Sequence, residues 1–302
     1  MNVAGGLAAQ FLGLAYALFV SRGTQGRARV VIRFQDGSSF DRGWHLGEIT
    51  DADALRKSNI QFEITRKKTA RPRVLISRFA PGLMKRVHRV RRNESFPTVV
   101  TMEELQSVLS APPPVLNPRA DSYLADYRIV ESVWPQLGEV MGAISTPHNF
   151  VRSAGTEDSI SIHWRLGDYL SSDFHGHVRL EAILTCISEA RLHNPDLRVR
   201  FFSDSPDLVK AALAVLPLEN YEVVDSPNIW LALTEMSRSR WFVGTNSGIS
   251  LLAALAIHHS GRHQTRIFLP SQWSVERLGT DLPPPNLLSR VALYDPRLRK
   301  PT

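Results

Sequence analysis

The chain has 302 residues, of which 43% are apolar and 22% charged, and its formal net charge is +7. This composition is ordinary for a soluble globular protein, and the length suits one large domain or two of ordinary size. The single cysteine, Cys186, excludes an internal disulfide and fits a reducing, cytoplasmic compartment. Because Cys186 lies in an apolar helical stretch, we expect a buried core thiol rather than a nucleophile.

Residues 2–20 carry no charge, and a segment of this length just suffices to cross a bilayer. A signal peptide, a membrane anchor and a buried helix are therefore alternatives. No basic residue precedes the apolar run, Gly5 and Gly6 break it early, and Gln10 lies within it. We predict a glycine turn at Gly5-Gly6 and a buried helix from Ala8 to Val20. The N–H groups of such a turn can approach an anion, so Gly5 and Gly6 are candidate phosphate-binding residues.

Asp51-Ala52-Asp53 resembles the D-x-D sequence that holds a divalent metal in many nucleotide-sugar enzymes. The same residues follow Thr50 and precede an Ala-Leu-Arg stretch, a pattern typical of a helix cap and first turn. We predict the start of a helix here and no metal site. Just before it in the chain, the β-branched run Arg29–Phe34 predicts a strand.

Residues 66–92 hold eleven Lys or Arg and no acidic residue, so this basic segment accounts for the whole positive balance. Within it Leu83, Val87 and Val90 share one helical face, and basic side chains surround them. The pattern suits a helix on an anionic membrane surface or one that binds a polyanion. A solvated basic face explains it nearly as well. Nucleic acid is not an expected partner, because interleaved aromatic residues and a known reading motif are absent.

Strands and helices alternate regularly after residue 158. The predicted strands are Ser159–Trp164, Val199–Phe202, Tyr221–Val224, Trp241–Val243 and Arg266–Leu269, and the predicted helices are Val178–His193, Pro206–Leu216, Asn228–Ser237 and Gly248–His259. This alternation predicts an α/β fold with a parallel sheet. The proline-rich stretch 93–120 predicts connecting loops. A polar link at 155–158 indicates a boundary within 140–158 between two domains, 1–150 and 151–302.

Polar side chains follow three of these strands where each strand ends. They are His163, Arg165 and Asp168 after the first strand, Asp204 after the second, and Thr245, Asn246 and Ser247 before the helix that opens at Gly248. In open α/β sheets the ligand crevice lies at the carboxyl ends of the strands. Arginine and a helix N-terminus both bind phosphate there. An Arg–Asp pair that closes a loop, and helix caps without a ligand, remain alternatives.

The same stretches resemble the motifs of the α-1,2-fucosyltransferases of glycosyltransferase family 11. The stretch 163–169 looks like their H-x-R-R-G-D-Y, 201–204 like F-F-S-D, 233–250 like L-M-S-x-C…I-x-A-N-S-T-F-S, and 5–10 like G-G-L-G-N-Q. All four occur in the family's order and at similar spacing. The chain departs from the pattern at three places. Leu166 replaces the second arginine, and Ala9 replaces the asparagine. The aromatic residues usual after the third motif are replaced by Gly248, Ile249 and later aliphatic residues.

The resemblance implies a GT-B-like fold of two Rossmann-type halves and an inverting transfer of fucose from GDP-fucose, without a metal or other cofactor. Arg165, joined by Asn246 and Ser247, would hold the diphosphate, and Asp204 would lie near the nucleoside. His163 and Asp168 would shape the first-motif loop, with Asp168 either the catalytic base or the residue that orients Arg165. The acceptor would be a glycan or lipid-linked saccharide. From its clustered charge, we expect the basic segment 66–92 to rest peripherally against an anionic membrane or to recognise an anionic acceptor. Alternatives are a different nucleotide sugar, or a non-catalytic polyanion-binding protein on the same fold.

Overall fold

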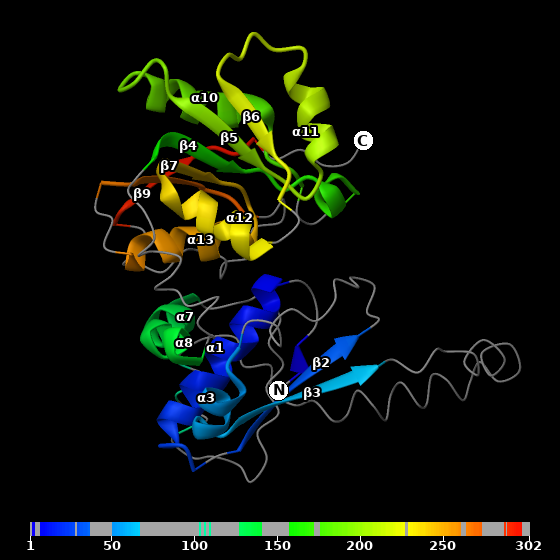
Figure 1. The fold of residues 1–302 in the computed structure, drawn as a ribbon, viewed down its shortest axis with the longest axis vertical. Coiled ribbons are helices and arrows are strands. Elements are labelled where there is room, and N and C mark those ends of the chain that lie inside the picture. Colours follow the sequence, from blue (N-terminus) through cyan, green and yellow to red (C-terminus); the bar gives the residue numbers. More distant parts are fainter. Residues whose placement is uncertain are drawn as a thin grey trace, which may run out of the picture. The chain divides into compact units, whose positions relative to one another are not determined.

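The computed structural model describes residues 2–3, 7–27, 29–36, 50–66, 103, 106, 109, 127–140, 157–171, 176–226, 229–260, 264–273, 287 and 289–297. The chain divides into two compact units, Met1–Val133 and Trp134–Thr302. The described part of each unit contains helices and one parallel sheet (Figure 1). The predicted α/β class with a parallel sheet in each half is therefore confirmed.

The contacts divide the chain between Val133 and Trp134. The predicted boundary at 150/151 lies outside the described residues and stays a prediction. Helix α7 (Tyr127–Ser132) packs against the N-terminal helix of the first unit, whereas α8 (Trp134–Val140) belongs to the second. The Trp134 ring stacks on His259 of the second unit, with 4.9 Å between the ring centroids. Stacking of this kind adds to the apolar burial of both rings, which explains why residues 134–140 go with the C-terminal unit.

The first unit contains β1 (Asn2–Val3), α1 (Leu7–Gly23), β2 (Val30–Asp36), α3 (Ala52–Lys57) and β3 (Ile60–Arg66). Its strands are parallel and lie in the order β1-β2-β3. Helix α1 is buried on nearly every side, including Gln10, which fits a core helix. The predicted helix Ala8–Val20 and the predicted strand at 29–34 are confirmed. Among the described residues, none of the helices combines the length and the apolar character that a membrane span requires.

Asp51 is the N-cap of α3, as the sequence predicted. Its carboxylate accepts hydrogen bonds from the backbone N–H groups of Asp53 and Ala54, at 2.8 and 3.1 Å. These two hydrogen bonds lower the pKa of Asp51. Satisfying the first N–H groups of a helix in this way is the ordinary role of an aspartate at this position. The D-x-D sequence is thus explained by helix capping.

The second unit contains a six-stranded sheet with helices between the strands. Its elements are α8, β4 (Glu157–His163), the 3-10 helix η2 (Gly167–Ser171), α10 (Leu180–Arg191), β5 (Arg198–Phe202), α11 (Pro206–Leu213), β6 (Tyr221–Val224), α12 (Ile229–Arg238), β7 (Ser239–Gly244), α13 (Gly248–His259), β8 (Arg266–Pro270) and β9 (Val291–Tyr294). Every strand and helix predicted after residue 158 is present, with ends shifted by a few residues. Among the described elements after residue 158, only β9 and η2 were not predicted.

All neighbouring strands of this sheet are parallel, in the order β6-β5-β4-β7-β8-β9. Helices α10 and α11 cover one face, and α12 and α13 cover the other (Figure 1). Strand β4 shows how its sequence serves both faces, because successive side chains point to opposite sides. Ile160, Ile162 and Trp164 enter the apolar core with α10. Ser159 and Ser161 point the other way and hydrogen-bond the Ser239 hydroxyl, at 2.8 and 2.6 Å.

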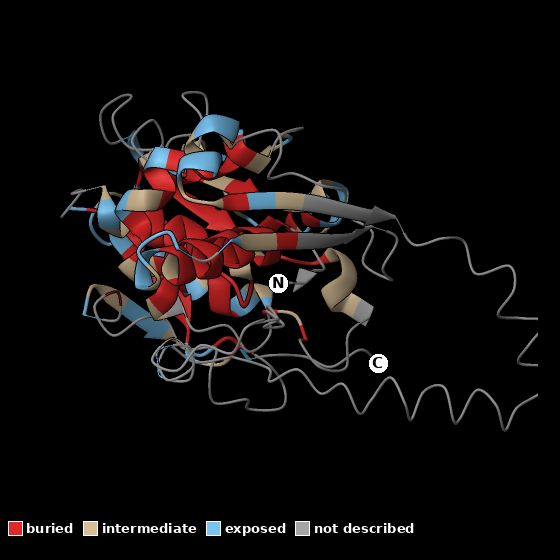
Figure 2. Ribbon diagram, turned by 90° about the horizontal axis from the view of Figure 1, so that it is seen from below, coloured by how far each residue is buried: buried red, intermediate tan, exposed pale blue. Residues whose placement is uncertain are grey.

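The buried residues, red on the ribbon of Figure 2, lie mainly in strands and helices. Cys186 lies in α10 within this apolar cluster and is buried, as predicted. Burial raises the pKa of the Cys186 thiol to about 12. The thiol therefore stays protonated at neutral pH, where only a thiolate is an effective nucleophile.

Candidate functional site

The strand order of the second unit changes direction between β4 and β7. From β4 the chain moves outward through β5 to β6, then returns to β7 on the other side of β4 and continues through β8 to β9. This is the doubly wound order in which the two loops after the central strands leave in opposite directions. His163, the last residue of β4, pairs with Gly244, the last residue of β7. The first and third motifs therefore lie together at the topological switch point.

Arg165 lies immediately beyond the end of β4, and its side chain is only 11% exposed. Its Nη2 and Nε donate to Oδ1 of Asp168, at 2.7 and 3.1 Å. Its Nη1 lies 3.0 Å from Oδ2 of Asp204, which follows β5. The guanidinium also lies over the Tyr169 ring, 5.5 Å from the centroid. Three residues that sequence reasoning selected from two separate motifs are thus brought into one charged cluster.

Asp204 also fixes the backbone of the Arg165 loop. Its Oδ1 accepts the N–H of Leu166, at 3.0 Å. Leu166 replaces the second arginine of the resembled motif, and its side chain is buried in the apolar core beside α10. An arginine at this position would have to be buried in that core, so the substitution agrees with the local packing.

Thr245, Asn246 and Ser247 are all buried, at 0%, 2% and 5% exposure. Thr245 Oγ1 accepts the N–H of Arg165, at 3.1 Å. Asn246 Nδ2 donates to the carbonyl oxygens of Gly176 and Trp273, both at 3.2 Å. Ser247 is the N-cap of α13 and accepts the Ile249 N–H. These side chains hold the loops together, so the group that α13 can offer an anion is its positive N-terminal end.

His163 links β4 to α13 and stays uncharged. It is 4% exposed, and its Nδ1 lies 2.7 Å from the Ser250 hydroxyl, which also accepts the N–H of Thr245 at 2.9 Å. Burial, and to a lesser degree the charge on Arg165, lower the pKa of His163 to about 3. A neutral buried imidazole with this partner positions the loop and does not exchange protons near pH 7. Ser250 lies at the end of the third-motif stretch, although its partners could not be read from the sequence.

Two of the sequence predictions concern residues outside the described part of the chain. Gly5 and Gly6 fall between β1 and α1, and the basic segment 66–92 lies beyond β3 except for Arg66 itself. The phosphate-binding role of the two glycines and the membrane role of the segment therefore stay predictions.

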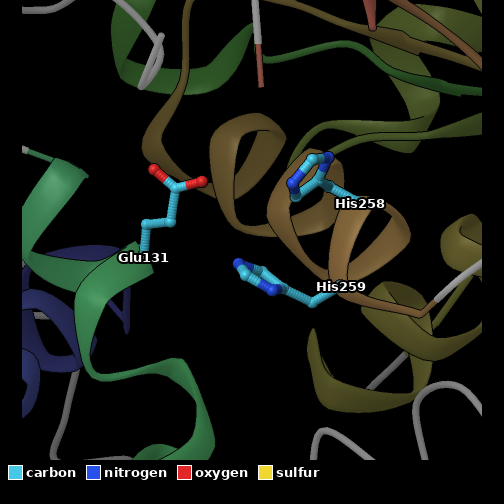
Figure 3. A group of neighbouring side chains, drawn as sticks. All are labelled: Glu131, His258 and His259. Carbon is cyan, nitrogen blue, oxygen red and sulfur yellow. The ribbon is translucent and has the colours of Figure 1, made fainter. Parts of the chain in front are cut away.

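Taken one unit at a time, the described residues contain no trio of His, Cys, Asp or Glu with atoms close enough to hold a metal ion. His258 and His259 are consecutive on α13, and their rings meet edge-on with 5.1 Å between centroids (Figure 3). The Nη1 of Arg290 lies 3.3 Å from His258 Nδ1, so that nitrogen already has a partner. Glu131, also labelled in Figure 3, is part of α7 in the first unit, and we do not count these three residues as a metal site.

A cavity of about 420 Å³ lies in the second unit on the α10 side of the sheet. Its lining residues are Trp164, His177, Arg179, Leu180 and Glu181. Trp164 directly precedes Arg165, and its indole N–H donates to the carbonyl of Val178, at 3.0 Å. Sequence reasoning did not select the other lining residues, because no motif or strand end marks them.

Comparisons with known proteins leave the family of this chain open. No family model and no curated protein match the sequence. Among solved structures, POFUT1 in complex with GDP covers 89% of this chain and 97% of its own, with 13% identity and a TM-score of 0.48. The E. coli heptosyltransferase WaaC with ADP covers 97% and 92%, with 10% identity and a TM-score of 0.40. A family 9 glycosyl transferase from Veillonella parvula covers 97% and 85%, with 11% identity and a TM-score of 0.39. At these values the likenesses assign neither a family nor a function.

Proposed function

We propose that this protein is a GT-B-like glycosyltransferase whose second unit binds a nucleoside diphosphate sugar at the β4–β7 switch point. The proposed donor is GDP-fucose, and the proposed reaction is an inverting transfer to a glycan or lipid-linked saccharide. One observation carries the proposal: a buried guanidinium, Arg165, and the N-terminus of α13 follow the paired ends of neighbouring strands, β4 and β7. The resemblance of the four motifs supports the choice of fucose.

The chemistry of glycosyl transfer explains why such a site needs these groups. As the glycosidic bond breaks, the sugar gains oxocarbenium character and negative charge accumulates on the departing diphosphate. A fixed cation and aligned N–H dipoles stabilise that charge without a metal ion, because they are already oriented when the charge develops. Arg165 would supply the cation, and the first turn of α13 would supply the dipoles. Thr245 and Asn246 would act by holding these two elements in place.

The role of Asp168 follows from its position on Arg165. Its carboxylate lies on the Nε–Nη2 edge of the guanidinium, the edge suited to a bidentate contact with phosphate. A diphosphate that takes this edge would displace Asp168. The displaced carboxylate, 33% exposed in this structure, would then lie beside the bound donor, where it can accept the proton of an acceptor hydroxyl.

The test of the proposal is stabilisation by nucleotide. A ligand at a hundredfold excess over its dissociation constant stabilises a protein by about 2.7 kcal/mol. We expect GDP to raise the unfolding midpoint of the wild type more than UDP or dTDP does, and we expect Arg165→Ala to lose that shift. Arg240→Ala is the matched control, because Arg240 is an exposed arginine of β7 that pairs with Asp158, at 3.6 Å.

The outcomes separate the alternatives. A larger shift with UDP or dTDP would replace the donor but keep the site. Equal GDP shifts in the wild type and Arg165→Ala would contradict the site. A wild type that shows no nucleotide effect and releases no GDP from GDP-fucose, but binds heparin in a salt-sensitive way, would identify a non-catalytic polyanion-binding protein.

A further inference from the structure

Asp204 engages the Arg165 loop with both of its carboxylate oxygens. Oδ1 accepts the N–H of Leu166, at 3.0 Å, and Oδ2 lies 3.0 Å from Nη1 of Arg165. Asp204 lies 38 positions after Leu166 in the chain and follows the neighbouring strand, β5. A carboxylate that accepts a backbone N–H and pairs with a guanidinium makes two charge-assisted contacts, which are stronger than contacts between neutral groups.

Gly167 shows how closely the loop is fitted to this carboxylate. A Cβ atom built on Gly167 would lie 2.1 Å from Asp204 Oδ2 and 3.0 Å from its Cγ. Real Cβ atoms do not approach neighbours so closely, so any larger residue at position 167 has to move the Asp204 side chain. Gly167 is not among the residues with positive φ. The glycine is therefore explained by contact with Asp204 rather than by backbone conformation.

The two aspartates hold different edges of the same guanidinium. Asp168 belongs to the same loop as Arg165 and contacts it through one oxygen, and its side chain is 33% exposed. Asp204 is less exposed, at 24%, and ties the loop to another strand. Replacement of Asp168 by a ligand would leave the Asp204 contacts intact.

We propose that Asp204 is a positioning residue that fixes Nη1 of Arg165 and the Leu166 backbone, so that the opposite edge of the guanidinium faces the donor diphosphate. This inference rests on the proposed function. It departs from the role that the motif resemblance implies for Asp204, which is contact with the nucleoside. Both carboxylate oxygens already have partners within the unit, and those partners lead to the phosphate-binding residue.

The test compares GDP with GMP, which shares the nucleoside but has one phosphate fewer. Asp204→Asn keeps an oxygen that can accept the Leu166 N–H, but it removes the charge that pairs with Arg165. Losing one hydrogen bond to a charged group raises a dissociation constant by about tenfold or more. We therefore expect Asp204→Asn to raise the dissociation constant of GDP, measured by calorimetric titration, by about tenfold. We expect GMP binding to change by less than about twofold.

Two further variants keep the test independent of the stability of Asp204→Asn. Gly167→Ala displaces the carboxylate without removing it, and it should reproduce the selective loss of GDP binding. Asp207→Asn changes an exposed aspartate at the start of α11 and should bind both nucleotides like the wild type. If the variants lose as much affinity for GMP as for GDP, the inference about Asp204 is wrong. It is also wrong if neither Asp204→Asn nor Gly167→Ala weakens GDP binding. Both results leave the proposed function standing. A wild type that does not bind GDP would overturn the proposed function and this inference with it.

Discussion

Arg165 lies between two carboxylates, which repel an anion at the place where the guanidinium would attract it. Arg165 contributes one positive charge, and Asp168 and Asp204 contribute one negative charge each. A diphosphate therefore meets a cluster that is not cationic as a whole, and it gains the full attraction of Arg165 only when one carboxylate leaves. Asp168 is the more exposed of the two, and Asp204 is also held by the Leu166 N–H, so we expect Asp168 to be the partner that leaves.

This difference predicts the behaviour of Asp168→Asn. Removing the negative charge while keeping the side-chain shape should tighten GDP binding by about fivefold at low salt, since partly exposed charge pairs contribute about 1 kcal/mol. Calorimetric titration of GDP measures this directly, and the gain should shrink as salt is added. Weaker GDP binding in the variant would show that Asp168 helps to hold the donor. If transfer from GDP-fucose is lost while GDP binds more tightly, Asp168 is the base.

The sequence predicted the positions of the candidate site residues in the fold better than it predicted their partners. The positions of His163, Arg165 and Thr245 at strand ends followed from the βα pattern, because the carboxyl ends of parallel strands share one edge of the sheet. The contacts of Asp204 with Arg165 and Leu166 did not, because they depend on the β4–β5 register and on how tightly the 165–168 loop turns. Capping explained Asp204 in the sequence, yet no side-chain cap bond is made at the N-cap of α11, which is Ser205.

At the scale of elements, the connection between β4 and α13 makes the unit sensitive to acid. His163 titrates near 6.5 in an unfolded chain and at about 3 in the fold. Between these pH values the unfolded state binds more protons, so the contribution is complete above pH 6.5 and is lost as the pH falls. His259, whose pKa is lowered to about 4 by burial and then by His258, acts in the same direction.

The corresponding prediction concerns the slope of stability against pH. The unfolding midpoint of the wild type should fall between about pH 6.5 and pH 4, and that of His163→Asn should fall less steeply, since the variant has no imidazole to protonate. Thermal unfolding in buffers of matched ionic strength compares the two slopes. Parallel curves would show that His163 is not the group that titrates. Titration of carboxylates affects both proteins and cancels in the comparison.

The elements that the sequence missed have few sequence signals. Strand β9 is an edge strand of four residues, Val291–Tyr294, whose middle residues are exposed. Its sequence is an apolar run, but so short a run does not distinguish a strand from other structures. Its place is fixed by pairing with β8 and by the Tyr294 hydroxyl, which donates to the Gly244 carbonyl at 2.8 Å. Such long-range contacts are invisible before the sheet order is known.

At the scale of the whole molecule, the order of the second sheet turns separate motifs into one site. The alternating pattern predicted a parallel sheet but allowed several strand orders. The observed order places β4 and β7 side by side at the centre, which is what brings the first and third motifs together. The sheet of the first unit was predicted less completely. Its strand β1 has only two residues, and its strand β3 was not predicted.

The charge distribution carries a prediction of its own. The segment 66–92 accounts for the positive balance of the chain. Neutralising basic side chains within it should therefore abolish the attraction of the protein to anionic lipid. We expect a variant with Lys85, Arg86, Arg89 and Arg92 replaced by Gln to lose sedimentation with phosphatidylserine-containing liposomes, while GDP stabilisation is kept. Unchanged liposome association would remove the membrane role and leave a solvated basic face.

The most direct test of the whole account is a crystal structure of the wild type with GDP. The account predicts diphosphate oxygens within about 3 Å of Nε and Nη2 of Arg165, with Asp168 displaced from that edge and Asp204 still on Nη1. A diphosphate bound elsewhere, with Arg165 still held by both aspartates, would contradict the central claim that this guanidinium binds the donor.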